Sequence, residues 1–359
     1  MAETEILIVG AGPVGLTAAI ELNRRGKAVR IVDRDPEPTS ESRAIAIHPR
    51  TLDLLEAAGV TERLLAAGVR VKGVRVVAQG RLRATLDLTE IPHRFNFLLS
   101  LPQDRTERIL LDALGERGIA VEQGTAVTGL EPAADEATVA LAGPEGDRQE
   151  RFAWVIGADG AHSAVRKALG IPFPGAPYPF EWSLADVEID GPVEPDHVEA
   201  HLDPHRPVLF RAPIGSNRHR LIANGPDAIG RVPETWRIAA VHWKSSFRVS
   251  HRQAERVGAG RVWIVGDAAH IHSPAGGRGM NLGMEDATTL AERISRGDIG
   301  SWPDERRAEA AAWIVASDRL QRVATNDGAL VRRALPRLIA LALAIPSLRR
   351  RALENFVAL

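Results

Sequence analysis

The sequence predicts an α/β protein in which a Rossmann-like parallel sheet carries an inserted antiparallel-sheet domain and a helical C-terminal segment. Short apolar runs without alternation are typical of buried parallel strands, and they occur at 6–9, 29–32, 152–156 and 262–265. Between them lie longer alternating stretches, typical of a half-buried antiparallel sheet. The expected division is residues 1–69, 102–171 and 255–330 for the first domain, 70–101 and 172–254 for the inserted β-sheet domain, and 331–359 for the C-terminal helices.

Composition restricts the function classes. A chain of 359 residues with 45% hydrophobic and 25% charged residues suits a globular protein of two domains. The 45 basic residues nearly balance the 46 acidic ones, so the net charge of -1 gives no reason to expect nucleic acid or an anionic membrane as partner. Cysteine is absent, which excludes disulfides, thiolate nucleophiles and cysteine-ligated metals. We expect a cytoplasmic protein without a metal site.

The only strongly apolar segment near the C-terminus is 335–345, which Pro336 and Arg337 interrupt. It is too short to span a bilayer, so we expect no transmembrane segment. A helix packed on the protein is the favoured interpretation, and a surface-docking or dimer helix is the alternative.

The first motif is a glycine-rich turn between a strand and a helix. Gly10, Gly12 and Gly15 follow the strand at 6–9, and an apolar helix begins at Val14. A second strand then ends at Asp33, 18 residues after Gly15. Such glycines allow a pyrophosphate to approach a helix N-terminus, and the acid can bind a ribose. This arrangement predicts a dinucleotide site.

The second motif lies at 261–283. An apolar strand ends at Gly266, Asp267 follows at its carboxyl end, and Pro274 precedes a run of glycines. Beyond Asn281 the apolar spacing becomes helical. A strand, a carboxylate, a glycine loop and a helix N-terminus suit an electron-rich, polyhydroxylated cofactor.

Together these motifs resemble those of one family. The fingerprint with Asp33, then Arg43, then Gly157-Ala158-Asp159-Gly160, then Gly266-Asp267-Ala268-Ala269-His270 with Pro274, occur in the order found in FAD-dependent aromatic hydroxylases. These are the single-component flavoprotein monooxygenases typified by para-hydroxybenzoate hydroxylase. An NAD dehydrogenase, the alternative for the fingerprint alone, leaves the later motifs unexplained.

The resemblance implies noncovalent FAD in the Rossmann-like domain and a substrate site on the inserted sheet. In this family Gln103 would contact the flavin side of FAD, Val127 would pass the adenine, and backbone groups of Met280 and Asn281 would meet the flavin. Pro274 would form a rigid wall beside the reacting ring, and His270 would be structural. The implied FAD-binding residues are Gly10, Gly12, Pro13, Val14, Gly15, Asp33, Arg34, Arg43, Gln103, Val127, Asp159, Asp267, Pro274, Gly277, Gly279, Met280 and Asn281.

The family reaction uses NADPH or NADH as a transient co-substrate, O2, and a flavin C4a-hydroperoxide to hydroxylate an aromatic small molecule. The type enzyme deprotonates its phenol through a tyrosine relay, whereas this chain has one tyrosine, Tyr178. The resemblance places His201 where the reactive tyrosine would be, as a candidate general base, and places Ala212 and Ile214 where a Ser and an Arg hold the substrate carboxylate. We therefore expect a larger, less acidic substrate, such as a polycyclic phenol or quinone.

Other functions remain open at this point. A flavin-dependent reductase or dehydrogenase on the same fold would not activate oxygen. A halogenase would carry a WxWxI segment, in which neither Trp182 nor Trp243 lies. The oligomeric state, monomer or homodimer, is also open.

Overall fold

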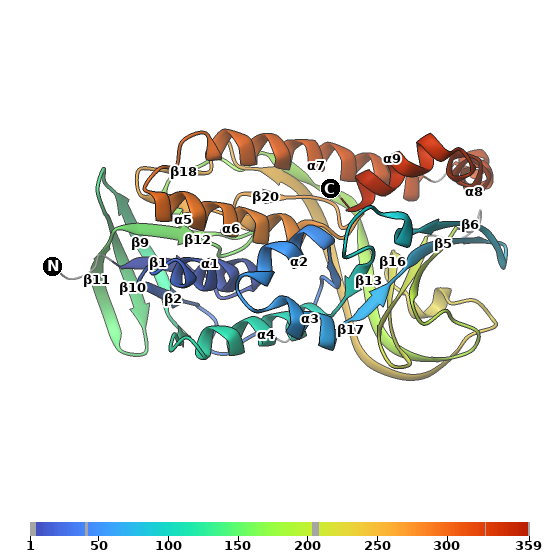
Figure 1. The fold of residues 1–359 in the computed structure, drawn as a ribbon, viewed down its shortest axis with the longest axis horizontal. Helices are drawn as coiled ribbons and strands as arrows, with labels where there is room; N and C mark the ends of the chain where they lie inside the picture. The colour runs from blue at the N-terminus through green and yellow to red at the C-terminus, as the bar shows by residue number, and fades with distance from the viewer. Residues whose placement is uncertain (1–4, 40–41, 203–207, 327, 358–359) are drawn as a thin grey trace.

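The computed structural model describes residues 5–39, 42–202, 208–326 and 328–357. Its two large sheets lie side by side along the long axis, and helices run along them (Figure 1). The helices are α1 Pro13–Arg24, α2 Pro49–Glu56, α3 Thr61–Ala67, α4 Gln103–Gly115, α5 Ala164–Ala168, α6 Gly279–Arg296, α7 Trp302–Ala324, α8 Ala329–Ala344 and α9 Pro346–Val357.

The first large sheet is the predicted Rossmann-like one. Its order is β18-β19-β12-β1-β2-β8, with all neighbours parallel except β18. The strands are β18 Gly258–Ala259, β19 Val262–Ile264, β12 Trp154–Gly157, β1 Ile6–Val9, β2 Val29–Val32 and β8 Val121–Glu122. All four residues of β1 are buried, as the unbroken apolar run predicts.

One hydrophobic cluster joins this sheet to the helices on one side and to a three-stranded sheet on the other. It contains Leu16 of α1, Leu110 of α4 and Leu290 of α6 on the helical side. It also contains Val139 from a three-stranded sheet of β11 Gly146–Phe152, β10 Ala137–Gly143 and β9 Ala126–Pro132. The cofactor motifs therefore lie on a layered, closely packed support.

The second large sheet has the order β20-β17-β13-β16-β15-β14-β5-β6. Its strands are β20 His270–Ile271, β17 Arg237–Gln253, β13 Gly175–Asp190, β16 Arg218–Asn224, β15 Leu209–Gly215, β14 His197–His201, β5 Gly73–Ala78 and β6 Arg81–Asp87. Both predicted insertions thus contribute strands to one sheet, while the exact domain boundaries remain a prediction. A small sheet of β3 Ala46–Ile47, β7 Leu98–Ser100 and β4 Val69–Val71 lies at the start and end of the first insertion.

The second sheet has two different faces. On one, which we call the inner face, Arg220 binds the carboxylate of Asp186 at 2.7 and 2.8 Å and the carbonyl oxygen of Ser42 at 2.6 Å. On the other, the outer face, Leu209 packs with Trp236 in a separate hydrophobic cluster. Because neighbouring residues of a strand point to opposite faces, this assigns a face to each side chain of β14, β15 and β16.

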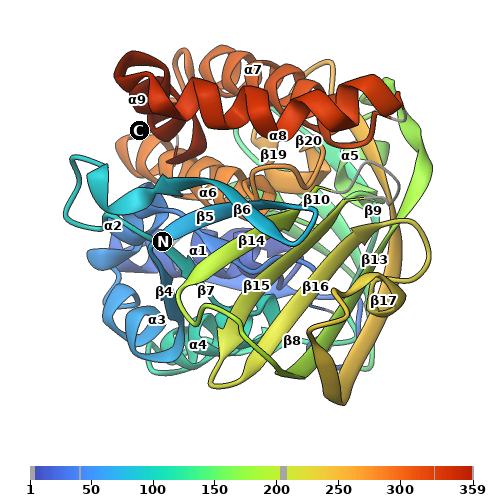
Figure 2. The same cartoon turned by 90° about the vertical axis from the view of Figure 1, so that its right-hand side faces the viewer.

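The C-terminal helices close the molecule along one edge (Figures 1 and 2). Leu343 of α8 and Leu353 of α9 join a cluster that includes Leu86 of β6. The apolar segment that Pro336 was expected to interrupt forms one helix, which continues through the proline. A proline inside a helix costs one backbone hydrogen bond, and the burial of Pro336 against the protein offsets this loss.

We predict that Arg220→Leu lowers the free energy of unfolding by about 3 kcal/mol, because removal of one partner leaves the Asp186 carboxylate uncompensated. The matched control is Arg237→Leu on the same sheet. Arg237 pairs with Asp190 but is 78% exposed, so its loss should cost about 0.5 kcal/mol or less. Urea unfolding of the apoprotein measures both, and equal effects would contradict this role for Arg220.

Candidate active site

The glycine turn after β1 combines residues with two different roles. Gly10 has a φ of +102°, and a Cβ there would lie 2.5 Å from the carbonyl oxygen of Ala158. A Cβ on Gly15 would lie 1.9 Å from the carbonyl oxygen of Gly10. These two glycines are therefore required for the packing of α1 against the sheet.

Gly12 has no such internal reason to be glycine. Its φ is -72°, which any residue adopts, and no atom lies within 4 Å of the position of a Cβ. It stands at the N-terminus of α1, directly before Pro13, where backbone N–H groups lack helical partners. The open space in front of Gly12 is what a bound phosphate requires.

A cavity of about 260 Å³ opens beside this turn. Asp33 lies at its wall, where its carboxylate accepts hydrogen bonds from the N–H of Ala11 at 2.6 Å and of Asp35 at 2.9 Å. The acid is thus oriented by the turn itself. The predicted residues that line the cavity are Gly10, Gly12, Asp33, Arg34, Gln103, Val127 and Asp159.

Two buried acceptors in the cavity wall have no hydrogen-bond partner among the described residues. One oxygen of Asp159 accepts from the N–H groups of Ala164 and Val165 at the start of α5, whereas Oδ1 is unpaired. Gln123 Oε1 is also buried and unpaired, and sequence reasoning missed this residue. Unpaired buried acceptors are costly, and the hydroxyl and amino groups of a dinucleotide would supply the missing donors.

Glu107 is a second cavity residue that the motifs did not indicate. It is 4% exposed, and burial raises the pKa of its carboxyl to about 7, helped by the charges of Asp104 and Asp33 and opposed by a hydrogen bond from Gln103. Gln103 in turn accepts from the N–H of Ala44 at 3.2 Å. Glu107 lies on α4 without any motif spacing around it, so no local signal could identify it.

Asp267 extends the site toward α6. A Cβ on Gly266 would lie 3.1 Å from Val14, and one on Gly283 would lie 2.6 Å from Val14, so the Asp267 turn and α6 both pack on α1. The side chain of Asp267 is exposed to solvent, yet many protein atoms lie close enough to desolvate its carboxylate. Desolvation by that protein raises the pKa of Asp267, against the opposing charges of His270 and Arg43. A solvent-accessible carboxylate shortly after β19 suits the ribityl hydroxyls of FAD.

The 274–281 loop is fixed by the side chain of Asn281, which is fully buried. Its oxygen accepts from the N–H of His48 and the hydroxyl of Thr51, both at 2.8 Å. Its nitrogen donates to the carbonyls of Ala46 at 2.8 Å and Gly277 at 3.1 Å. Since the amide is fully used in this way, a ligand can be bound only by the backbone at this position.

The loop also orients the N-terminus of α6. Gly276 and Gly277 have φ values of +90° and +62°, which glycine adopts without strain. The N–H of Gly277 donates to the carbonyl of Pro274, and α6 begins two residues later at Gly279, followed by the buried Met280. A helix N-terminus favours negative charge in front of it, as the predicted flavin contact requires.

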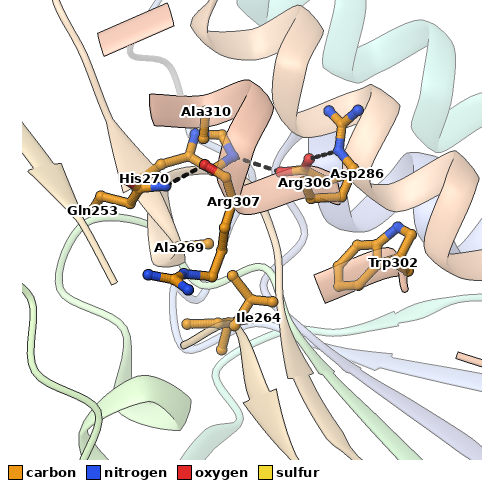
Figure 3. A pocket seen from close by; sticks show the side chains of 10 residues that line it. Gln253, Ile264, Ala269, His270, Asp286, Trp302, Arg306, Arg307 and Ala310 are labelled. Carbon is orange, nitrogen blue, oxygen red and sulfur yellow. Dashed lines mark hydrogen bonds and ion pairs between the residues drawn. The ribbon is translucent and has the colours of Figure 1, made fainter. Parts of the chain in front are cut away.

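His270 belongs to a buried polar cluster behind the site, which Figure 3 shows from close by. Its Nε2 lies 2.6 Å from an Asp286 oxygen, and the other oxygen of Asp286 accepts from Arg306 at 2.6 Å. Asp286 also accepts from the N–H of Gly266 at 3.1 Å. These contacts connect α6 and α7 to the Asp267 turn and give His270 a structural role. Burial by itself raises the pKa of Asp286, but the charges of His270 and Arg306 and their hydrogen bonds to the carboxylate keep this pKa below its usual value.

The two predicted arginines differ in position. Arg34 is exposed at the cavity wall near Asp35. Arg43 is exposed, and its carbonyl lies 3.4 Å from the Arg220 guanidinium that holds this segment. Neither position identifies a ligand atom, so their contacts with FAD stay predictions.

The structure places the candidate general base His201 on the outer face of the second sheet, away from Arg220, and its role stays a prediction. His201 pairs with Leu209 across the strands, so both lie on the outer face. Its Nε2 lies 3.1 Å from Glu199, and its ring packs edge-on against Trp236. The inner face, marked by Arg220, meets the cofactor domain instead. The sequence could not fix the phase of β14, and a shift of one residue moves a side chain to the other face.

Comparisons with known proteins agree with this geometry. A family model described as FAD binding domain matches residues 3–237 and 217–300. The chain is 34% identical over 357 residues to the 12-dehydrotetracycline 5-monooxygenase/anhydrotetracycline 6-monooxygenase of Streptomyces rimosus subsp. rimosus, covering 89% of this chain and 69% of that protein. The chain belongs to the FAD-dependent aromatic monooxygenases. The predicted family, fold class and FAD cofactor are therefore confirmed.

Two further matches show how much of the chain and of its relatives the similarity covers. The 6-methylpretetramide 4-monooxygenase of Streptomyces rimosus is 35% identical over 309 residues, which cover 81% of this chain but only 55% of that protein. The p-nitrophenol 4-monooxygenase PnpA from Pseudomonas putida DLL-E4 superposes with a TM-score of 0.86 at 22% identity, covering 98% of this chain and 96% of that one. This monooxygenase structure shows the fold over nearly the whole chain.

Because the chain belongs to this family, we infer that these residues form an elongated FAD-binding site. The cavity beside Gly12 would hold the pyrophosphate and adenosine, Asp267 the ribityl chain, and the N-terminus of α6 the flavin. Among the described residues, no helix is both long and apolar enough to cross a bilayer.

We predict that Gly12→Val folds normally but loses FAD, because the added side chain fills the open space in front of α1 without touching protein. Gly15→Val should instead fail to fold, since its Cβ would collide with the Gly10 carbonyl. Flavin absorbance after purification and a thermal melt of each apoprotein measure the two outcomes. Normal FAD content in a folded Gly12→Val protein would exclude this phosphate position.

We predict that Glu107 makes the apoprotein less stable at neutral pH than at acidic pH. The folded state favours the protonated carboxyl, so its contribution is complete below the usual pKa near 4.5 and is lost as pH rises through about 7. The difference is at most about 3 kcal/mol.

Urea unfolding at about pH 5 and pH 8 should show this loss in the wild type and not in Glu107→Gln. The control is Glu116→Gln at the end of the same helix, where a hydrogen bond from Arg63 lowers the pKa of Glu116, so it titrates below this window. An unchanged pH dependence in Glu107→Gln would show that another group is responsible.

Proposed function

We propose that this protein hydroxylates a polycyclic aromatic substrate, a phenol or quinone, that binds between the inner face and the 274–281 loop. The observation that carries the proposal is a set of hydrogen bonds that position the inner face, the 274–281 loop and α7 relative to one another. On one side Arg220 holds Ser42 and Asn281 holds Ala46, so the sheet and the loop share one segment. On the other, the hydroxyl of Tyr178 donates to Asp318 of α7 at 3.0 Å.

The chemical nature of the inner face supports a large apolar ring system. Trp182, Phe210 and Ile222 lie on it and pack in one hydrophobic cluster. Ala212 lies on the same face, in register with Arg220, and carries no group that could hold a carboxylate. A relative acts, by its name, on dehydrotetracycline and anhydrotetracycline, which fits this apolar surface.

Two buried donors near this face lack a partner among the described residues: Nε1 of Trp182 and Nε2 of Gln321. Gln321 lies on α7 and accepts a hydrogen bond from the hydroxyl of Ser273, next to Pro274. Unpaired N–H donors are best satisfied by carbonyl or phenol oxygens. We propose that they orient the oxygens of the substrate beside Pro274.

FAD, reduced by NADPH or NADH and reacting with O2, supplies the electrophilic oxygen when bound. The residues of the chain position the substrate and the cofactor and keep water away from them. Pro274 would form a rigid wall beside the ring, the backbone N–H groups of Met280 and Asn281 would face the electron-rich side of the cofactor, and a closed site would exclude water.

The cellular location and the oligomeric state also belong to this proposal. We place the protein in the cytoplasm, where NADPH and NADH are available, and retain monomer or homodimer as its state. A flavin-dependent reductase without oxygen activation remains the alternative, although no observation in the structure favours it.

We predict that the purified protein consumes O2 and NADPH or NADH in equal amounts when a polycyclic phenol or quinone is added. Parallel absorbance and oxygen-electrode traces measure the ratio, and peroxide should be a minor product because the site excludes water. FAD reduction without oxygen uptake would favour the reductase.

The matched control is His201→Ala, since His201 lies on the outer face away from the inner face. Its turnover and its coupling of NAD(P)H oxidation to hydroxylation should equal those of the wild type. A strong loss of coupling would restore His201 as a candidate base.

A further inference from the structure

The C-terminal helices carry an apolar surface that faces outward. Helix α8 exposes Leu330 by 82%, Leu338 by 59% and Leu341 by 63%, and Val331 and Ile345 are more than 40% exposed. Residues 330, 334, 338, 341 and 345 are three or four apart, so they share one face of the helix. Figures 1 and 2 show α8 beside α9 at the end of the molecule that lies on the right in Figure 1 and faces the viewer in Figure 2. We call this surface the α8 face.

The α8 face is flanked by arginines. Arg333 and Arg337 are exposed, and their spacing places them along one border of the apolar stripe. On α9, Arg350 and Arg351 are exposed beside the exposed Leu348. The opposite side of α8 contacts β6 and β5, so only the outward side is available to a partner.

Charge is strongly segregated along the chain. Residues 328–359 contain six arginines and one glutamate, a net charge of +5. Because the whole chain carries -1, the remaining residues carry -6. The nearly neutral net charge of the whole chain is therefore the sum of a basic, apolar C-terminal segment and an acidic remainder.

We propose that the α8 face binds the surface of an anionic lipid bilayer. A helix with exposed leucines bordered by arginines lies in the interface of such a membrane, where the apolar side chains enter the acyl boundary and the arginines meet lipid phosphates. This docking needs no transmembrane helix, and it would bring the enzyme to a region in which apolar substrates concentrate.

A second copy of this chain fits the same surface less well. A two-fold dimer places the same patch of both subunits in contact. Arg333 and Arg337 would then approach the same arginines of the partner, and Glu354 is the single acidic residue of 328–359 that could compensate. Charge complementarity thus favours anionic lipid over self-association.

The experiment is sedimentation of the full chain with phosphatidylcholine vesicles, either pure or with about 30 mol% phosphatidylglycerol. We expect binding to the anionic vesicles only, and release as salt screens the charges. Arg333→Gln with Arg337→Gln should lower the partition coefficient roughly twenty-fivefold, since each arginine contributes about fivefold. Leu338→Ser with Leu341→Ser should abolish binding.

The control is Val241→Ser with Arg248→Gln on β17, at the other end of the eight-stranded sheet. Val241 is 44% exposed and Arg248 is exposed, so this variant removes similar groups from a different surface. It should bind like the wild type. FAD content and the thermal melt report folding of every variant independently of binding.

Absence of binding to anionic vesicles by the folded protein overturns the proposal, as does equal loss of binding in the control. Analytical ultracentrifugation identifies the other occupant. Suppose that the protein does not bind vesicles but forms a dimer, and that Leu338→Ser with Leu341→Ser dissociates this dimer. That result would show that a second copy covers the α8 face.

Discussion

The buried amide of Asn281 is the constraint on which the rest of the site depends. Three of its four hydrogen bonds join the first turn of α6 to Ala46, His48 and Thr51 in β3, α2 and the link between them, more than two hundred residues earlier, and the fourth is to the carbonyl of Gly277. A buried amide with all its bonds formed has one favourable orientation, because any other leaves unpaired polar groups inside the protein. The direction of the α6 N-terminus is therefore fixed before any ligand arrives.

The same segment also connects the two sheets. Asn281 binds at Ala46 and His48, while Arg220 binds at Ser42, four residues before Ala46. The inner face and the glycine loop are thus positioned by neighbouring parts of one short stretch of chain. This explains why both bonds use fully buried side chains, since an exposed link would be weakened by competition with water. It also explains how a chain whose two large sheets are built from interleaved segments keeps the inner face and the glycine loop in one fixed relation.

The residues that the sequence predicted are those whose role is local. Gly10, Gly15 and Asp33 act within one strand-turn-helix unit, so their spacing carries the information. Glu107 and Gln123 reach the cavity from elements without a motif, and only the folding of distant segments brings them there. The face on which His201 lies could not be predicted, because it depends on the register of β14, and the alternation in a strand of five residues is too short to fix that register.

The charge of the chain illustrates the same limit at a larger scale. A total of -1 correctly describes the long-range field, which averages over the whole molecule. A surface contact, however, is decided within a Debye length of about 8 Å at physiological salt, and at that range only the groups on one face count. The arginines and leucines of α8 lie together because the helix continues through Pro336, whose ring faces the protein. If the helix ended there, Leu338 and Leu341 would leave the face that carries Leu330, and the basic segment would have no continuous apolar stripe to accompany it.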